Sequence, residues 1–303
     1  MKIGMIGLGK MGANMTTRLI KGGHEVVVYD LNPDAIASAT EKGATGADSL
    51  EDLVIKLTAP RAVWVMVPAG KPTDATVAAL SDVLDAGDVI VDGGNSNYHE
   101  SVERGKELGK KDIHFVDVGT SGGVWGLTEG YSMMVGGTEE AVHLVQDALK
   151  TLAPGPDKGW GHVGPGGSGH YVKMVHNGIE YGLMQAYAEG YSIMKHKEEF
   201  GIDLHQVSTI WQHGSVIRSW LLDLIANAVE ENPEMTDIAP FVPDSGEGRW
   251  TVFEAIDQDV PAPVITLALL ARLRSRDDES FADRLLSAMR NQFGGHKIHR
   301  ENS

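Results

Sequence analysis

The chain has 303 residues, of which 42% are hydrophobic and 22% are charged, and its formal net charge is −16. This composition is typical of a soluble globular protein with one large domain or two, and the acidic balance argues against nonspecific binding to nucleic acid or anionic membranes. The lack of cysteine excludes disulfides, thiolate catalysis and cysteine-ligated metal. The chain shows neither a signal-peptide pattern nor a stretch of ~20 apolar residues, so we expect a cytoplasmic protein.

The N-terminal half alternates short β-rich runs with segments of helical periodicity. The candidate strands are residues 2–7, 25–30, 62–67, 88–93 and 114–119. The helical segments between them are residues 10–21, 33–42, 73–84 and 97–109. A strand-like piece at 131–137 and a helical one at 138–152 extend this half. Such alternation predicts a parallel, doubly wound sheet.

Glycine and proline then dominate residues 153–170, and we place a domain boundary there, after residue 163. The helical segments beyond it are residues 168–197, 203–213, 215–230, 250–257, 263–275 and 279–291. The sequence therefore predicts a Rossmann-type doubly wound α/β domain over residues 1–163. An all-α domain with a polar C-terminal tail is predicted over residues 164–303.

The first βα connection, GLGKMG at residues 7–12, has the G-x-G-x-x-G spacing of a dinucleotide-binding turn. In this setting Gly7 permits the turn, Gly9 admits a pyrophosphate and Gly12 allows close packing of helix on strand. The N–H groups of the following helix add donors for the phosphates. A plain glycine-rich turn is the alternative. The candidate cofactor-binding residues are Gly7, Leu8, Gly9, Lys10, Met11 and Gly12.

Asp30 ends the second strand, where an acidic residue accepts hydrogen bonds from the adenosine ribose and repels a 2′-phosphate. Leu31 follows it, without a nearby arginine to bind that phosphate. The pair predicts NAD as cofactor, with NADP less favoured. Asp30 could instead be a turn residue or a cap for the helix that follows Pro33.

Two more strands end in segments that suit ligand binding, because open α/β sheets bind ligands at the carboxyl ends of their strands. One is DGGNS at residues 92–96, which presents Asn95, and the other is TSGG at 120–123, which presents Ser121, Gly122 and Gly123. Capping of the helix near Asn97 is an alternative role for Asn95.

The segment GHYVKMVHNGIEYG at residues 169–182 places polar side chains where a helix normally carries its apolar stripe. Lys173, His176, Asn177, Glu180 and Tyr181 recur at i, i+3, i+4, i+7 and i+8. The remaining faces are apolar or small, so we expect a helix buried nearly all round with its polar stripe facing a substrate. A solvated polar face is the alternative. A buried lysine with a lowered pKa can act as a general base.

Several motifs together resemble the decarboxylating 6-phosphogluconate dehydrogenase family, in its short-chain form, over nearly the whole chain. They are GLGKMGANM, DGGNSNY, GTSGGVWG, GSGHYVKMVHNGIEYGLMQ, VIRSW and RNQFGGH. The resemblance implies oxidation of 6-phosphogluconate at C3, reduction of NAD, and loss of CO2 to yield ribulose 5-phosphate. It also implies a homodimer or homotetramer in which the C-terminal tail reaches the partner subunit's site.

The resemblance further implies a role for each site residue. Lys173 would take the C3 hydroxyl proton, Glu180 would protonate the enediol carbon, and Asn95 and His176 would hold the C3 oxygen and its neighbours. The implied carboxylate ligands are Ser121, Gly122 and Gly123, and the implied phosphate ligands are Tyr181, Arg218, Arg290 and His296. Asn177 completes the substrate-facing stripe. Val67, Pro68 and Ala69 would form a turn that passes the cofactor.

Two departures from the family pattern stand out. Asp30–Leu31 replaces an asparagine–arginine pair that favours NADP, and the phosphate loop DSGEGRWT keeps only Arg249, which we leave unassigned. The histidines show no metal-ligand spacing, so no metal is expected. Two other functions remain open: an NAD-dependent β-hydroxyacid dehydrogenase of a small non-phosphorylated acid, such as 3-hydroxyisobutyrate, and a non-catalytic dinucleotide sensor.

Overall fold

The computed structural model of the chain describes residues 1–295 and 297–299. It divides into two compact units, Met1–Gly178 and Ile179–Ser303, and the division falls inside helix α8 (Ser168–Lys195). The boundary that the sequence pattern places after residue 163 stays a prediction.

The first unit is built on one sheet with the strand order β3-β2-β1-β4-β5-β6-β7-β8. The strands are β1 (Lys2–Ile6), β2 (Glu25–Tyr29), β3 (Thr45–Gly46), β4 (Ala62–Val65), β5 (Val89–Asp92), β6 (His114–Ser121), β7 (Ser132–Gly136) and β8 (Trp160–Gly164). All pairs from β3 to β6 are parallel. The carboxyl ends of β4, β5 and β6 therefore meet at one edge of the sheet.

Strand β7 departs from the parallel pattern that the alternation predicts, because it pairs with β6 in antiparallel orientation. The connection between them holds only η1 (Gly123–Trp125) and α6 (Gly126–Glu129). A parallel return needs a crossover of about a dozen residues or more, so this short connection sends the chain straight back.

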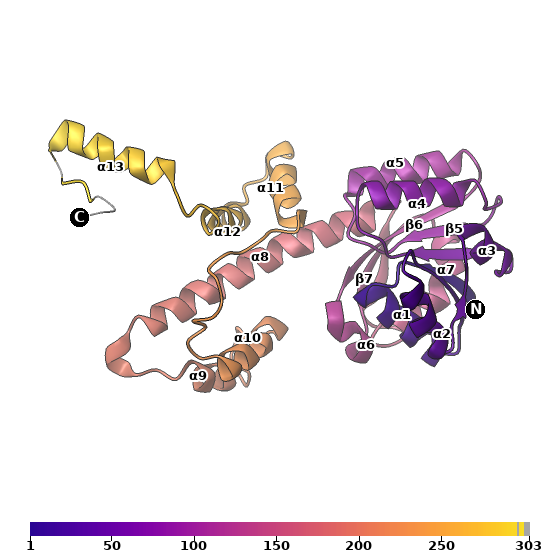
Figure 1. The fold of residues 1–303 in the computed structure, drawn as a ribbon, viewed down its shortest axis with the longest axis horizontal. Helices are drawn as coiled ribbons and strands as arrows, with labels where there is room; N and C mark the ends of the chain where they lie inside the picture. The colour runs from indigo at the N-terminus through magenta and orange to yellow at the C-terminus, as the bar shows by residue number, and fades with distance from the viewer. Residues whose placement is uncertain (296, 300–303) are drawn as a thin grey trace. The chain divides into compact units, whose positions relative to one another are not determined.

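Helices cover both faces of the sheet because its central strands are apolar on both sides. They are α1 (Lys10–Lys21), α2 (Pro33–Glu41), α3 (Leu50–Ile55), α4 (Lys71–Ser81), α5 (Tyr98–Gly109) and α7 (Glu139–Leu152). Val26 and Val28 pack into a core with α1 and α7, whereas Val27 between them packs into a core with α3, α4 and α5. Figure 1 shows α4 and α5 on one side of the sheet and α1 and α2 on the other.

The described part of the second unit is helical, which confirms the predicted fold class. After α8 come η2 (Glu198–Phe200), α9 (Leu204–Trp211), α10 (Trp220–Glu231), α11 (Glu247–Asp257), α12 (Pro263–Arg274) and α13 (Phe281–Gly294). One small buried apolar cluster of this unit consists of Tyr181, Val252, Ala268 and Leu269, and Leu222, Ala226 and Val229 of α10 are buried as well. Among the residues described, no helix is both long and apolar enough to cross a membrane.

Candidate active site

The glycine-rich turn between β1 and α1 has the geometry that a dinucleotide requires. Gly7 has φ +88°, and a side chain there would meet the Met66 carbonyl at 2.6 Å. A Cβ at Gly12 would lie 1.9 Å from the Gly7 oxygen, so glycine is needed for the close approach of helix to turn. At Gly9 the space is open for 4 Å, and no side chain caps α1. The turn therefore fits a pyrophosphate. Of its other residues, Leu8 is buried, Met11 is half-buried and Lys10 is exposed.

Asp30 is attached directly to this turn. Its Oδ2 accepts the Leu8 N–H at 2.6 Å and its Oδ1 accepts the Asn32 N–H at 2.8 Å. The cap of α2 is Asn32, whose side chain accepts the Asp34 N–H, so the capping alternative for Asp30 is wrong. The carboxylate thus lies beside the glycine turn, where a ribose would be bound.

The turn after β5 leaves Asn95 available. Asp92, only 1% exposed, accepts hydrogen bonds from the Gly94 N–H at 3.1 Å and the Ser96 hydroxyl at 2.7 Å. Asn97 caps α5 by accepting the His99 N–H, so Asn95 does not serve as the cap. Within residues 1–295 and 297–299, the Asn95 side chain makes no hydrogen bond.

The neighbouring strands at the same edge carry the other two predicted segments. Val67 is half-buried, while Pro68 and Ala69 are exposed, and Thr73 of α4 donates to the Pro68 carbonyl at 2.9 Å. Ser121 is the last residue of β6. Gly122 and Gly123 follow at φ +127° and +49°, a conformation that favours glycine. These turns and the Asn95 turn therefore share one edge of the sheet.

The first turns of α8 cross β6 at very short range. The buried Asp117 carboxylate of β6 accepts the Gly167 N–H at 2.6 Å and the His170 N–H at 2.8 Å. A Cβ at Gly119 would lie 2.3 Å from the Lys173 Cβ, and one at Gly169 would lie 2.5 Å from the main-chain carbonyl oxygen of Asp117. The predicted site lacks Asp117, Gly119 and Gly169. An aspartate and a glycine inside an otherwise apolar strand could have indicated that another segment packs closely there.

Three residues of the predicted stripe meet at this crossing. Lys173 is 5% exposed, and its Nζ donates to Asn177 Oδ1 at 2.5 Å and lies 3.3 Å from His176 Nδ1. The solvated-face alternative is therefore wrong for Lys173 and Asn177, both of which are buried. The expectation of a helix buried nearly all round is also wrong, because Ile179 and Leu183 are 52% and 48% exposed. Lys173 and Asn177 take the packed side of α8, whereas the apolar Val172, Ile179 and Leu183 are exposed.

In the second unit, Tyr181 is the buried centre of a polar group. Its hydroxyl accepts the Ser245 N–H at 3.1 Å, and the Arg272 guanidinium lies 3.5 Å from its ring centroid. Arg249 and Arg276 both bind Asp244. Burial alone would raise the pKa of Asp244, but hydrogen bonds from these two arginines outweigh it and lower the pKa.

Arg272 and Arg276 are absent from the predicted site, although ARLRSR at residues 271–276 is the kind of local cation cluster that an anion requires. Arg218 is exposed and lines a hollow of about 510 Å³ with Gln212 and Asp223. Arg290 is exposed on α13. Neither Arg218 nor Arg290 bonds to Tyr181 within the described chain.

Two further predicted residues are placed less fully. Glu180 lies half-buried on α8, one residue before Tyr181. His296 lies outside the described residues. Among the described residues, no three His, Asp or Glu side chains are grouped so that they could hold a metal ion.

Two family models match this chain. The model of the NAD binding domain of 6-phosphogluconate dehydrogenase matches residues 2–163, and that of the 6-phosphogluconate dehydrogenase C-terminal domain matches residues 169–283. The chain belongs to the 6-phosphogluconate dehydrogenase family. The family resemblance that the motifs suggest is thereby confirmed.

Individual members of the 6-phosphogluconate dehydrogenase family are similar to this chain over nearly its whole length. The NAD(+)-dependent, decarboxylating 6-phosphogluconate dehydrogenase of Haloferax volcanii is 45% identical over 302 residues, covering 99% of both chains. A putative 6-phosphogluconate dehydrogenase of Bacillus subtilis is 42% identical, covering 98% of both. The solved Plasmodium falciparum 6-phosphogluconate dehydrogenase matches with a TM-score of 0.84 and 31% identity, covering 100% of this chain but 67% of its own.

Proposed function

We propose that the chain oxidises and decarboxylates 6-phosphogluconate to ribulose 5-phosphate and CO2, with NAD as its cofactor. The observation that carries this is the pair of buried residues Lys173 and Asn177, with the half-buried His176 beside them, where α8 packs against β6 in a chain of this family. The first unit also offers the dinucleotide-type turn beside Asp30.

Lys173 is the proposed proton carrier. NAD, when bound at the β1–α1 turn, supplies the hydride acceptor for C3. Neutral Lys173 takes the proton of the C3 hydroxyl, while Asn177 and His176 hold its Nζ in place. The resulting 3-keto acid loses CO2 because the ketone accepts the electron pair of the breaking C1–C2 bond. The Lys173 ammonium then donates a hydrogen bond to the developing oxyanion.

The second proton is assigned to Glu180. It lies seven residues beyond Lys173 on α8, almost two turns and roughly 10 Å along the helix axis. That separation suits an acid and a base that act on different carbons of one substrate. Glu180 protonates the C2 carbanion equivalent of the enediol, which becomes C1 of ribulose 5-phosphate.

The substrate has an anionic group at each end, a carboxylate and a phosphate, and we assign each to a different set of residues. We assign the carboxylate to Ser121, Gly122 and Gly123, with Asn95 at the reacting carbon. Tyr181 and Arg272 are assigned to the phosphate, because Arg272 makes no ion pair with a described residue, whereas Asp244 neutralises Arg249 and Arg276. The roles of Arg218, Arg290 and His296 stay predictions.

One assay tests this function. The purified chain is given 6-phosphogluconate, gluconate or 3-hydroxyisobutyrate, each with NAD or NADP, and both the reduced cofactor and CO2 are recorded. We expect equal amounts of NADH and CO2 from 6-phosphogluconate only. Oxidation of 3-hydroxyisobutyrate without CO2 would establish the β-hydroxyacid dehydrogenase instead, and no turnover of any substrate would overturn the proposal.

Cofactor choice is expected to shift in the double variant Asp30→Asn, Leu31→Arg. Asparagine can still accept the Leu8 N–H but no longer repels a 2′-phosphate, and the arginine binds that phosphate. A charge-assisted hydrogen bond contributes about 1.5–3 kcal/mol, so the ratio of kcat/KM for NAD over NADP should fall at least about tenfold. Asp34→Asn, an exposed carboxylate on α2, is the control. An unchanged ratio would show that the ribose contact lies elsewhere.

We further propose that the chain is at least a homodimer joined through its second unit, and that it works in the cytoplasm, where NAD and sugar phosphates occur. The small core of this unit leaves apolar side chains of its helices exposed, Ile179, Leu183, Leu267 and Leu285 among them. Exposed apolar area of this kind marks a protein interface.

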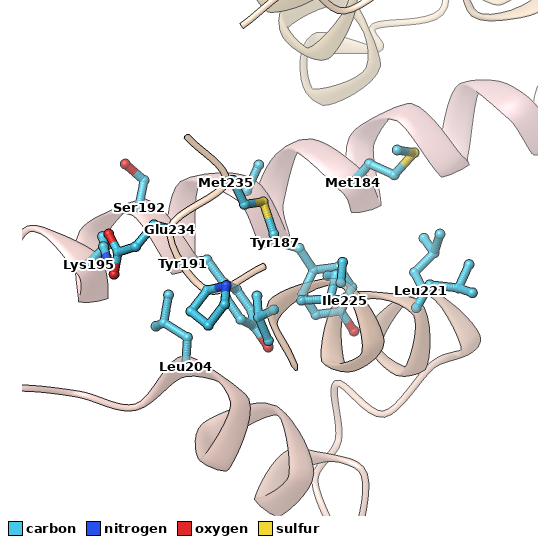
Figure 2. Close-up of a pocket in the computed structure, with 15 residues that line it drawn as sticks. Met184, Tyr187, Tyr191, Ser192, Lys195, Leu204, Leu221, Ile225, Glu234 and Met235 are labelled. Atoms are coloured by element: carbon cyan, nitrogen blue, oxygen red, sulfur yellow. Dashed lines mark hydrogen bonds and ion pairs between the residues drawn. The ribbon is translucent and has the colours of Figure 1, made fainter. Parts of the chain in front are cut away.

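A groove in the same unit supports this interface. It has a volume of about 530 Å³ and is lined by α8, α9, α10 and residues 233–235. In Figure 2 the side chains of Met184, Tyr187, Leu221 and Ile225 converge on it. The Tyr187 hydroxyl is bonded to Ser219, so the tyrosine presents its ring. A second copy's apolar helix is the proposed occupant.

The dimer predicts the effect of Leu224→Glu. Leu224 lines the groove, and a charge there would have to be buried without a partner in the dimer. We expect light scattering to show dimers for the native chain and monomers or aggregates for the variant. Ile55→Glu, at an exposed position on α3, should stay dimeric. A native chain that is monomeric at micromolar concentration would contradict the interface.

A further inference from the structure

A buried arginine lies directly behind the turn that presents Asn95. Arg104 of α5 is 7% exposed, and its Nη1 donates to Asp92 Oδ2 at 3.2 Å. Its Nε and Nη2 donate to Asp74 Oδ1 of α4 at 2.9 and 2.7 Å, and Nη2 also donates to Glu100 at 2.9 Å. One guanidinium therefore joins β5, α4 and α5.

Asp92 links Arg104 to the turn that carries Asn95. Its Oδ1 accepts the Gly94 N–H and its Oδ2 accepts the Ser96 hydroxyl, so both neighbours of Asn95 are held by the carboxylate that Arg104 neutralises. Without a cation, a carboxylate as buried as Asp92 is strongly destabilised. The turn would then rearrange to admit water to that carboxylate.

The same helix also grips α8. Ser101 Oγ of α5 lies 2.7 Å from His170 Nδ1, and His170 is buried in the first turn of α8, one turn before Lys173. A Cβ at Gly167 would lie 2.4 Å from the Val102 side chain, so the two helices meet closely. Helix α5 is thus bound to the Asn95 turn at Arg104 and to the Lys173 helix at Ser101.

We propose that Arg104 is a positioning residue, which acts through Asp92 to fix Asn95 relative to Lys173. The inference rests on the proposed function, in which both residues contact the reacting end of the substrate. Misplacement of such a group by about 1 Å can cost on the order of 100-fold in rate. Arg104 itself touches neither substrate nor cofactor in this assignment.

The chain provides a matched control at the other end of β5. Asp88, which directly precedes β5, is also 1% exposed, and Arg61 Nη1 donates to its Oδ2 at 2.8 Å. Arg61 binds Asp85 as well, at 2.9 Å. Arg61→Met therefore breaks a comparable buried ion pair of the same strand, but far from Asn95.

The test compares Arg104→Met, Arg104→Lys and Arg61→Met, each with and without Asn95→Ala. We expect both methionine variants to lower Tm, but only Arg104→Met to lower kcat, by about 10- to 100-fold. Arg104→Lys should recover part of kcat, since it keeps the charge near Asp92. In the Asn95→Ala background, Arg104→Met should lower kcat by less than about twofold.

Two outcomes would overturn the inference while the function stands. One is an equal fall of kcat in Arg61→Met and Arg104→Met, and the other is a full effect of Arg104→Met without Asn95. A native chain that fails to turn over 6-phosphogluconate would instead refute the proposed function. In that case, amide hydrogen exchange at Gly94 still tests whether Arg104 holds the Asn95 turn. Arg104→Met should speed this exchange at least about tenfold, and Arg61→Met should not.

Discussion

Replacing Lys173 with methionine is expected to lower kcat roughly 1,000-fold or more, because the variant has no group to take the C3 hydroxyl proton. Methionine matches the length of the lysine stem and carries no charge, so it fits the buried position where Lys173 packs beside Gly119. The cofactor turn is untouched, and the Kd for NAD should stay within about twofold. Steady-state turnover and fluorescence titration with NADH measure the two quantities.

Lys56→Met is the control for this variant. Lys56 is partly exposed and pairs with Asp52 at 2.6 Å, away from the proposed site. Its loss should leave kcat unchanged, because Lys56 has no part in the proposed site. It should also change the free energy of unfolding little, since surface pairs of this kind contribute about 1 kcal/mol or less to stability. A Lys173→Met variant that kept more than about a tenth of native activity would show that proton transfer is done by another group.

Of the single substitutions predicted for the first unit, we expect Asp117→Ala to lower the free energy of unfolding the most. Asp117 is fully buried and accepts two backbone N–H groups, those of Gly167 and His170, where α8 begins. Hydrogen bonds to a charged group contribute about 1.5–3 kcal/mol each, so the loss of both should lower the free energy of unfolding by about 3–6 kcal/mol. Because the same contacts set the start of the Lys173 helix, kcat should fall as well.

Urea unfolding of three variants tests this anchor. Asp117→Asn keeps one carbonyl acceptor and should lose about half as much free energy as Asp117→Ala. Asp157→Ala, which removes an exposed carboxylate of the same unit, should change it by less than about 0.5 kcal/mol. Equal unfolding midpoints for Asp117→Ala and the native chain would mean that other contacts hold α8 on β6.

Local patterns in the sequence were sufficient for the fold class and for the cofactor side of the site. The strand and helix periodicities, the glycine spacing of residues 7–12 and the acid at the end of β2 each depend on neighbours in the chain. Glycine at positions 7 and 12 is required by backbone contacts within one βα unit and its adjacent strand. For this reason these features could be predicted without knowing the tertiary fold.

Only the tertiary structure decided which side of α8 is packed and what it packs against. Periodicity places Lys173, Asn177 and Tyr181 on one stripe, but a polar stripe of this kind faces solvent in most helices. Lys173 is buried here because Asp117 and Gly119 of β6 hold the start of α8 at short range. Those contacts join residues about 50 positions apart, and local patterns carry no information on such pairs.

The same reason explains the remaining differences. Arg272 contacts the Tyr181 ring, and Arg104 pairs with Asp74, 30 positions away; both contacts join segments distant in sequence. The sequence by itself therefore determined the elements of this protein and its candidate chemical groups. The tertiary structure decided which carboxylates orient the chemical groups and which cations stay unpaired for an anionic substrate, because both depend on long-range packing.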